Sequence, residues 1–128
     1  MSDLRALIES GLVDKEDGII FDTGTNLLWQ QSPPNKTFTW KEAKKYCKSL
    51  TLAGYDDWRL PTIDELKVLI NKKYHPTIDP IFKCESEWYW SSSTYVGHPN
   101  DAWSIIFDGG SANVGIKVDG NFVRAVRG

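Results

Sequence analysis

Two adjacent carboxylates and an arginine stand in one short run, GYDDWRLPTIDEL, as Asp56, Asp57 and Arg59. Paired carboxylates can act as general acid and general base when both side chains converge on one bond. Neighbouring residues of a loop point apart, and no nucleophile accompanies this pair. We therefore interpret the run as a structural corner, in which Trp58 enters the core, Arg59 donates paired hydrogen bonds and Pro61 fixes the entry into a helix.

Other catalytic or metal chemistry has little support in the sequence. The serines of 91–93 have no histidine near them and no glycines of the kind that flank a nucleophile elbow. His75 and His98 are far apart, with no second ligand at helix or hairpin spacing, which argues against zinc. We expect no enzyme activity and no metal.

Calcium is the one cofactor that stays open, because the stretch His98-Pro99-Asn100-Asp101 places oxygen ligands in a loop. Calcium needs about six or more oxygen atoms, however, and few are visible here. The expectation is therefore no cofactor.

Ligand binding is the chemistry that the C-terminal part of the sequence favours. The loop 93–101 and the strands after it combine aromatic rings with amide and hydroxyl groups. Sugars and proteins are both held by such mixtures, so a glycan or a protein ligand is expected. The candidate ligand-binding residues are Tyr95, His98, Asn100, Asp101, Trp103, Ser111, Asn113 and Lys117.

The composition fits one domain with a real core and excludes two partner classes. The chain has 128 residues, 41% of them hydrophobic, and its net charge is only −2. A general affinity for nucleic acid or for anionic membranes is therefore not expected. A cluster of Lys117, Arg124 and Arg127 would still supply a local positive field for an acidic ligand.

Residues 1–17 have no long apolar run and carry acids throughout, so neither a signal peptide nor a transmembrane segment is predicted. This indicates a cytoplasmic protein or one exported by a non-classical route, and the location is otherwise open. The two cysteines, Cys47 and Cys84, follow no metal-like pattern and form either one bridge or two free thiols.

The elements that must position these residues begin with helices marked by strong start signals. A short helix is predicted over 2–10, followed by strands over 18–21 and 27–30. Capping boxes at Thr39–Glu42 and Thr62–Glu65 then predict two helices, the first reaching Leu50 and the second burying its side chains as far as Ile70.

The second half of the chain changes to a period of two, which is typical of strands. Strands are predicted over 88–92, 102–107, 111–118 and 122–127, with Trp58 and Trp90 buried and Trp88 or Trp103 half-exposed. Alternation over 111–118 predicts an inward face of Ala112, Val114, Ile116 and Val118. The fold class is therefore α+β, with two helices followed by an antiparallel meander.

Several motifs give the chain a specific resemblance. The runs DTGTNLLWQ, GYDDWRLPTIDEL, YWSSSTY, AWSIIFDGG and FVRAVR resemble, in order and spacing, the bacterial family of the Legionella collagen-like adhesin C-terminal domain. The resemblance covers a domain of residues 18–128 and leaves residues 1–17 as an N-terminal helical extension.

The resemblance implies a C-type-lectin-like fold, with two main helices packed on a small antiparallel sheet and a long loop region. Characterised relatives are adhesins that hold sulfated or acidic polysaccharides, often as trimers, so a glycan-binding, adhesive module and a homo-oligomer are expected. The fold is shared with phage and retroelement-diversified receptor-binding proteins, which keeps open a protein-recognition or assembly module of a phage-like or surface apparatus. The residues expected to be structural are Trp58, Arg59, Pro61, Trp90 and Arg124.

The chain departs from the family at one cysteine. The family's ending commonly reads VRCVR, whereas this chain has Ala125 in that place. The resemblance makes Cys47 the usual partner of the missing thiol, so Cys47 is expected to be free. A bridge between Cys47 and Cys84 is the alternative.

Overall fold

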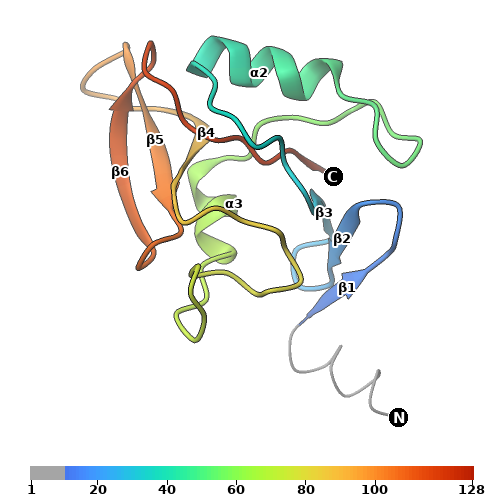
Figure 1. The fold of residues 1–128 in the computed structure, drawn as a ribbon. Helices are drawn as coiled ribbons and strands as arrows, with labels where there is room; N and C mark the ends of the chain where they lie inside the picture. The colour runs from blue at the N-terminus through green and yellow to red at the C-terminus, as the bar shows by residue number, and fades with distance from the viewer. Residues whose placement is uncertain (1–10) are drawn as a thin grey trace.

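The structure, a computed structural model, describes residues 11–128, and the predicted helix over 2–10 lies outside this range. The described residues form two antiparallel sheets and two short helices (Figure 1). The first sheet has the order β1-β2-β3-β7 and the second the order β4-β5-β6. The strands are β1 (Leu12–Asp14), β2 (Ile19–Asp22), β3 (Leu27–Gln30), β4 (Trp88–Thr94), β5 (Asp101–Ile106), β6 (Ser111–Ile116) and β7 (Val126–Arg127), and the helices are α2 (Trp40–Ser49) and α3 (Ile63–Val68).

The expected C-type-lectin-like architecture of two main helices on one small sheet is wrong. Strands dominate the described residues, and the helices α2 and α3 have only ten and six residues. Helix α3 ends early because Ile70, predicted to continue it, forms a bridge with Ile78 instead. Strand β1 was not predicted, yet Val13 pairs with Phe21 of β2. The division of the chain at residue 18 stays a prediction.

Both helix starts are confirmed, because local hydrogen bonds determine them. The Thr39 hydroxyl accepts the Glu42 amide and the Glu42 carboxylate accepts the Thr39 amide, with the same exchange between Thr62 and Glu65. Each box satisfies backbone donors that a helix start leaves free. These contacts form within four residues, so the sequence alone reveals them.

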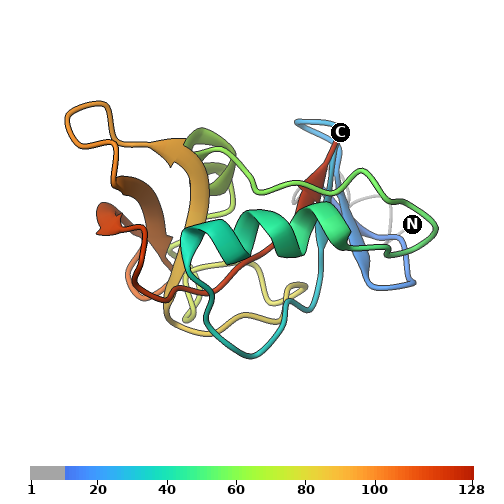
Figure 2. The same cartoon turned by 90° about the horizontal axis from the view of Figure 1, so that it is seen from above.

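Strands β4 and β5 of the second sheet are covered on both faces, and this divides the core into two clusters. On one face, Tyr89 and Ile105 pack with Leu66 of α3 and Trp29 of the first sheet. On the other face, Trp90 packs with Ala43 and Cys47 of α2. Figure 2 shows α2 extending along one side of both sheets. The buried state predicted for Trp58 and Trp90 is confirmed.

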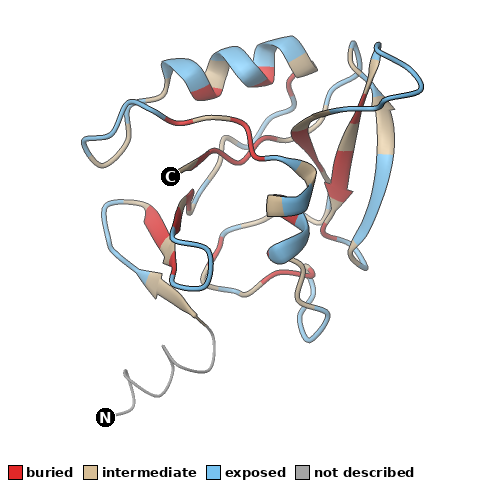
Figure 3. Ribbon diagram, turned by 180° about the vertical axis from the view of Figure 1, so that it is seen from behind, coloured by how far each residue is buried: buried red, intermediate tan, exposed pale blue. Residues whose placement is uncertain are grey.

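The predicted inward face of 111–118 is wrong. Ile116 and Val118 are 52% and 77% exposed, Ala112 is also exposed, and β6 ends at Ile116. Figure 3 shows β6 as largely exposed next to the buried residues of β5. Alternation reveals which residues share a face, but whether another layer covers that face depends on distant segments.

The run Gly54–Leu66 forms a bend held by two ion pairs, Arg59–Glu65 and Asp57–Arg127. Arg59 makes two parallel hydrogen bonds to the Glu65 carboxylate, at 2.8 and 2.7 Å, so helix α3 fastens its own entry. Asp57 instead bonds to Arg127 of β7. Trp58 is 3% exposed, and Pro61 is fully buried. Asp57 is bound to Arg127 of β7, whereas Asp56 is exposed to solvent. The two acids therefore do not form a catalytic pair.

Arg124 is fully buried and joins three backbone segments. Its guanidinium donates to the carbonyls of Gln30 and Gln31 at the end of β3 and to the carbonyl of Lys83, and it lies 4.8 Å from the centre of the Phe82 ring. These hydrogen bonds join segments that lie 41 to 94 residues apart in the sequence. A buried cation held by carbonyls is costly to remove.

Both cysteines are free, as expected. Cys47 and Ala125 belong to the same buried cluster, which agrees with the departure noted in the sequence. Burial raises the pKa of the Cys47 thiol to about 12. Among the residues that the structure describes, no helix is long and apolar enough to cross a membrane.

Replacing Arg124 by Ala should strongly destabilise the fold. The carbonyls of Gln30 and Lys83 would lose the guanidinium, and that of Gln31 would keep only the Lys83 amide, at an expected cost of about 3–5 kcal/mol in the free energy of unfolding. Urea unfolding followed by tryptophan fluorescence measures this cost. Arg127→Ala is the matched control, because Arg127 is on the same closing segment and pairs with the exposed Asp57, and it should have a much smaller effect. Equal losses in the two variants would contradict the role given to Arg124.

The Glu65 carboxylate makes the stability of the fold depend on pH. Hydrogen bonds from Arg59, and then from Thr62, hold the pKa of Glu65 below its ordinary value of 4.5. The stabilisation is thus complete above pH 4.5 and is lost as the pH falls through the lower pKa of the folded state. Glu65→Gln, which keeps the capping geometry, should be less stable than the wild type at neutral pH, and the difference should shrink as the pH falls below 4.5. Glu87→Gln, at an exposed position, serves as control; a constant difference at all pH values would refute the assignment.

Candidate functional site

The predicted binding loop forms the tip of the β4–β5 hairpin. Tyr95 and Trp103 meet there edge to face, with ring centres 5.6 Å apart. Tyr95 is 36% exposed and Val96 is 98% exposed. The tip therefore presents one aromatic edge and one aliphatic side chain to solvent, on a loop closed by a hydrogen bond from Tyr95 to Asp101.

Lys117 binds this tip to the rest of the domain. Its ammonium group donates to the Thr94 hydroxyl at 3.0 Å and to the Pro99 carbonyl at 2.7 Å, and it lies 3.9 Å from the centre of the Trp40 ring. Three internal contacts occupy this cation. Lys117 was predicted as a ligand-binding residue, and the structure places it as a support of the tip.

The polar residues of the loop are only partly available. The His98 imidazole is largely exposed and lies 3.9 Å from the Asp101 carboxylate. Asn100 accepts the Lys117 amide through its backbone carbonyl and is exposed. Within the described residues, no group of three His, Cys, Asp or Glu side chains is arranged to hold a metal ion.

Two further candidates lie away from the tip. In the β5–β6 register, Asp101 pairs with Ile116, whereas Ile106 pairs with Ser111. Ser111 is thus at the opposite end of the sheet from Tyr95. Asn113 pairs with Ser104, on the face opposite to that of Trp103 and Val114. The structure therefore divides the predicted residues into a tip group and a group on β6.

Asn113 belongs to a small hollow, which we call the Trp88 hollow. It measures about 260 Å³ and is lined by Trp88, Ser104, Asn113, Val114, Gly115, Asp119 and Asn121. Strands β4, β5 and β6 supply its floor, and the return after β6 supplies Asp119 and Asn121. Asn121 is fixed by two backbone hydrogen bonds with Phe38.

The Trp88 hollow combines one half-buried indole with polar groups that are not used internally. Among the described residues, no hydrogen bond or ion pair engages the Asp119 carboxylate or the Asn121 carboxamide. Asn113 accepts the Val114 amide through its side-chain oxygen at 2.8 Å. An aromatic surface next to free amide and carboxylate groups is suited to bind hydroxyl-rich ligands.

Sequence reasoning found Asn113 and missed the other members of the hollow. Trp88 or Trp103 was expected to be half-exposed, but no site was assigned to Trp88, and no binding role was predicted for Asp119 or Asn121. Asn121 reaches the hollow because its segment pairs with Phe38, more than eighty residues earlier. No local pattern reports such a pairing. The sequence did contain one indication of the hollow: the polar residues Asp119 and Asn121 closely follow the predicted strand that carries Asn113.

The basic cluster considered in the sequence does not form. Arg124 is buried, Arg127 is bonded to Asp57, and Lys117 is held by Thr94 and Trp40. A second hollow of about 450 Å³ contains Lys44, Lys48 and Arg59. Lys44 lies over Trp40 and Arg59 is bonded to Glu65, so two of these three cations are already engaged.

Comparison with protein families places the described domain in a known family. No curated protein matches the chain. The family of the Lcl C-terminal domain matches residues 18–127, which include every strand from β2 to β7 and both helices. The Trp88 hollow, the hairpin tip and the Arg59 bend all lie inside the matched range. The chain belongs to the Lcl C-terminal domain family.

Proposed function

We propose that this domain is a non-enzymatic, adhesin-like ligand-binding module and that the Trp88 hollow holds one sugar residue of a glycan. The observation that supports the proposal is the half-buried indole of Trp88 beside the unengaged polar groups of Asp119 and Asn121. A sugar ring stacks on an aromatic face, while planar carboxylate and amide groups bind its hydroxyls. Family membership agrees with a module of this type.

The size and charge of the hollow specify the ligand further. Its 260 Å³ falls just below the range of about 300–1000 Å³ that holds drug-sized molecules, which suits one ring of a longer chain. Asp119 is the only charged side chain that lines it. A neutral glycan therefore fits better than the sulfated or acidic polysaccharides bound by characterised relatives.

Binding is favoured over hydrolysis because the hollow contains a single carboxylate. Glycoside hydrolases commonly place two carboxyl groups across the scissile bond. Among the residues lining the hollow, only Asp119 carries one, and no cysteine or histidine lies beside it. Catalysis would require a second acid that this surface does not offer.

The expected trimer would strengthen such a site. A shallow hollow with one stacking ring binds weakly by itself, and several linked copies raise the overall affinity on a multivalent surface. Sedimentation velocity of the purified domain gives the number of copies. A single species at the mass of one chain, 14.5 kDa, would remove the trimer from this proposal.

A glycan array tests the proposed function. Wild-type protein should give saturable binding to neutral glycans, with or without a calcium chelator. Trp88→Ala should weaken binding about 30-fold, the effect of losing an aromatic anchor worth about 2 kcal/mol. Asn121→Asp, which leaves the core untouched, should also weaken binding.

Two controls give the result a definite meaning. Tyr74→Ala, which removes an aromatic side chain that is 40% exposed on a distant loop, should bind like the wild type. Tyr95→Ala tests the hairpin tip separately. The Trp88 hollow is refuted as the glycan site if no glycan on the array is bound. It is also refuted if Tyr95→Ala abolishes binding while Trp88→Ala leaves it unchanged.

A further inference from the structure

Strand β6 is an edge strand without the usual protection. It is the last strand of its sheet, with β5 on one side only. Edge strands are commonly blunted by charges, proline, bulges or short length, since their free backbone groups can pair with another chain. Ser111–Ile116 contains no charged residue and no proline, and its six residues pair with β5 without interruption.

The other edge strands that the structure describes are protected. Strand β1 has three residues and β7 has two. Strand β4 has a shift in register between Trp90 and Thr94 and is bridged by Phe122. The open edge of β6 is therefore a local exception rather than a general property of this fold.

The backbone of β6 is oriented for pairing. The Val114 amide donates to the side-chain oxygen of Asn113, its neighbour, at 2.8 Å rather than to a carbonyl of β5. Residues opposite each other in antiparallel strands alternate between bonded and non-bonded pairs, so the Ala112 amide points to the same free edge. The Asn113 oxygen thus occupies the place of a carbonyl from an added strand.

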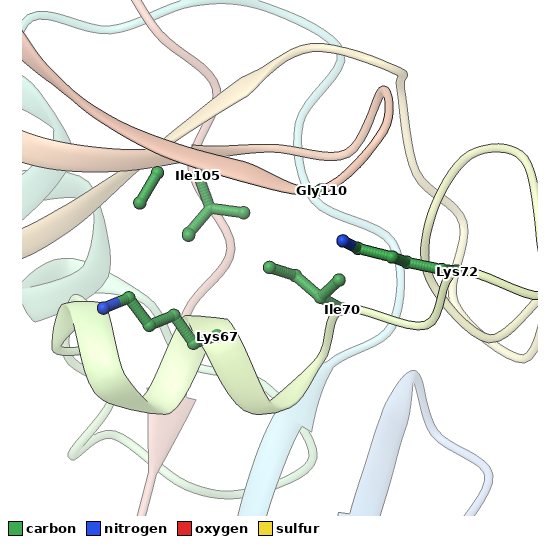
Figure 4. Close-up of a pocket in the computed structure, with 6 residues that line it drawn as sticks. Lys67, Ile70, Lys72, Ile105 and Gly110 are labelled. Atoms are coloured by element: carbon green, nitrogen blue, oxygen red, sulfur yellow. The ribbon is translucent and has the colours of Figure 1, made fainter.

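An apolar hollow flanked by two lysines adjoins this edge (Figure 4). It measures about 480 Å³ and is lined by Lys67, Ile70, Lys72, Ile105, Gly110 and Ala112. Gly110 is required at the rim, because a Cβ there would lie 2.7 Å from a methyl group of Ile70 and the backbone φ is +76°. Ala112 belongs both to the hollow and to the edge.

The charges at this hollow are unmatched. Lys67 and Lys72 are exposed, and neither forms an ion pair among the described residues. The nearest carboxylate in sequence to the rim, Asp108, lies beside His75. The whole chain has a net charge of −2, so this pair of cations is a local feature and favours an acidic partner.

We propose that β6 accepts an extended, acidic peptide segment of another protein as a fourth strand. The segment pairs with the backbone of Ala112 and Val114, places a branched apolar side chain in the hollow, and presents acidic side chains two residues away to Lys67 and Lys72. Alternate residues of a strand share one face, so an acid–apolar–acid pattern with a period of two satisfies all three contacts. This surface is on the sheet face opposite to the Trp88 hollow and is independent of glycan binding.

A library of random linear 12-residue peptides displayed on phage, selected on the immobilised protein, tests the proposal. Enriched peptides should carry Asp or Glu on both sides of Val or Ile, at a spacing of two. Affinities of the synthetic peptides are then measured by fluorescence anisotropy. The double variant Lys67→Glu, Lys72→Glu should weaken binding at least tenfold, and Ala112→Pro should do the same by removing an edge donor.

Matched controls separate this site from general charge and from glycan binding. Lys41→Glu with Lys45→Glu, on the exposed side of α2, changes the net charge equally and should leave peptide affinity unchanged, as should Trp88→Ala. Enrichment of basic peptides, no enrichment at all, or equal binding to the charge-reversed protein would overturn the proposal. Self-association that β6 variants abolish would also overturn it, by identifying a second copy of the chain as the occupant.

Discussion

The described part of the chain is organised around one buried cation, Arg124. Arg124 lies where the two sheets meet, and its guanidinium binds carbonyls at the end of β3 and in the segment before β4. The neighbouring residue Ala125 donates to the side chain of Gln30, which in turn donates to Tyr46 of α2. A few polar contacts therefore fix β3, the long connection and the first helix relative to one another. A hydrophobic side chain of similar volume would fill the space but could not satisfy the carbonyls.

This junction determines where the candidate surfaces lie. The closing segment passes from Asn121, at the Trp88 hollow, through Val123 and Arg124 in the interior to β7 in the first sheet. The polar residues that line the hollow are thus anchored by the same segment that fills the core. On the other side of the second sheet, α3 is held by the bond between Arg59 and Glu65, which sets the position of Lys67 beside β6.

Structure that depends on neighbouring residues could be predicted from the sequence, whereas the pairing of segments distant in the sequence could not. Both capping boxes and the burial of Trp58 and Trp90 follow from patterns of a few residues, and the structure confirms them. The inward face of 111–118 was wrong because alternation cannot tell a covered face from an open one. The balance of sheet and helix was also wrong, since β1 is only three residues long and α3 ends where Ile70 pairs with Ile78. Lys117 is an example at a candidate site. A lysine in this region suggests contact with a ligand, but its ammonium group already contacts Thr94, Pro99 and Trp40, which only folding brings close.

The two limits of the described chain lie beside the same turn. Gly11 accepts the Thr23 amide through its carbonyl, and Gly128 approaches the carbonyl of Asn26, both in the β2–β3 connection. Figure 1 places this connection on the far side of the molecule from the β4–β6 sheet. Gly11 and Gly128 are therefore held close to one connection of the first sheet. The surfaces proposed for glycan and peptide binding therefore lie on the sheet that is remote from both Gly11 and Gly128.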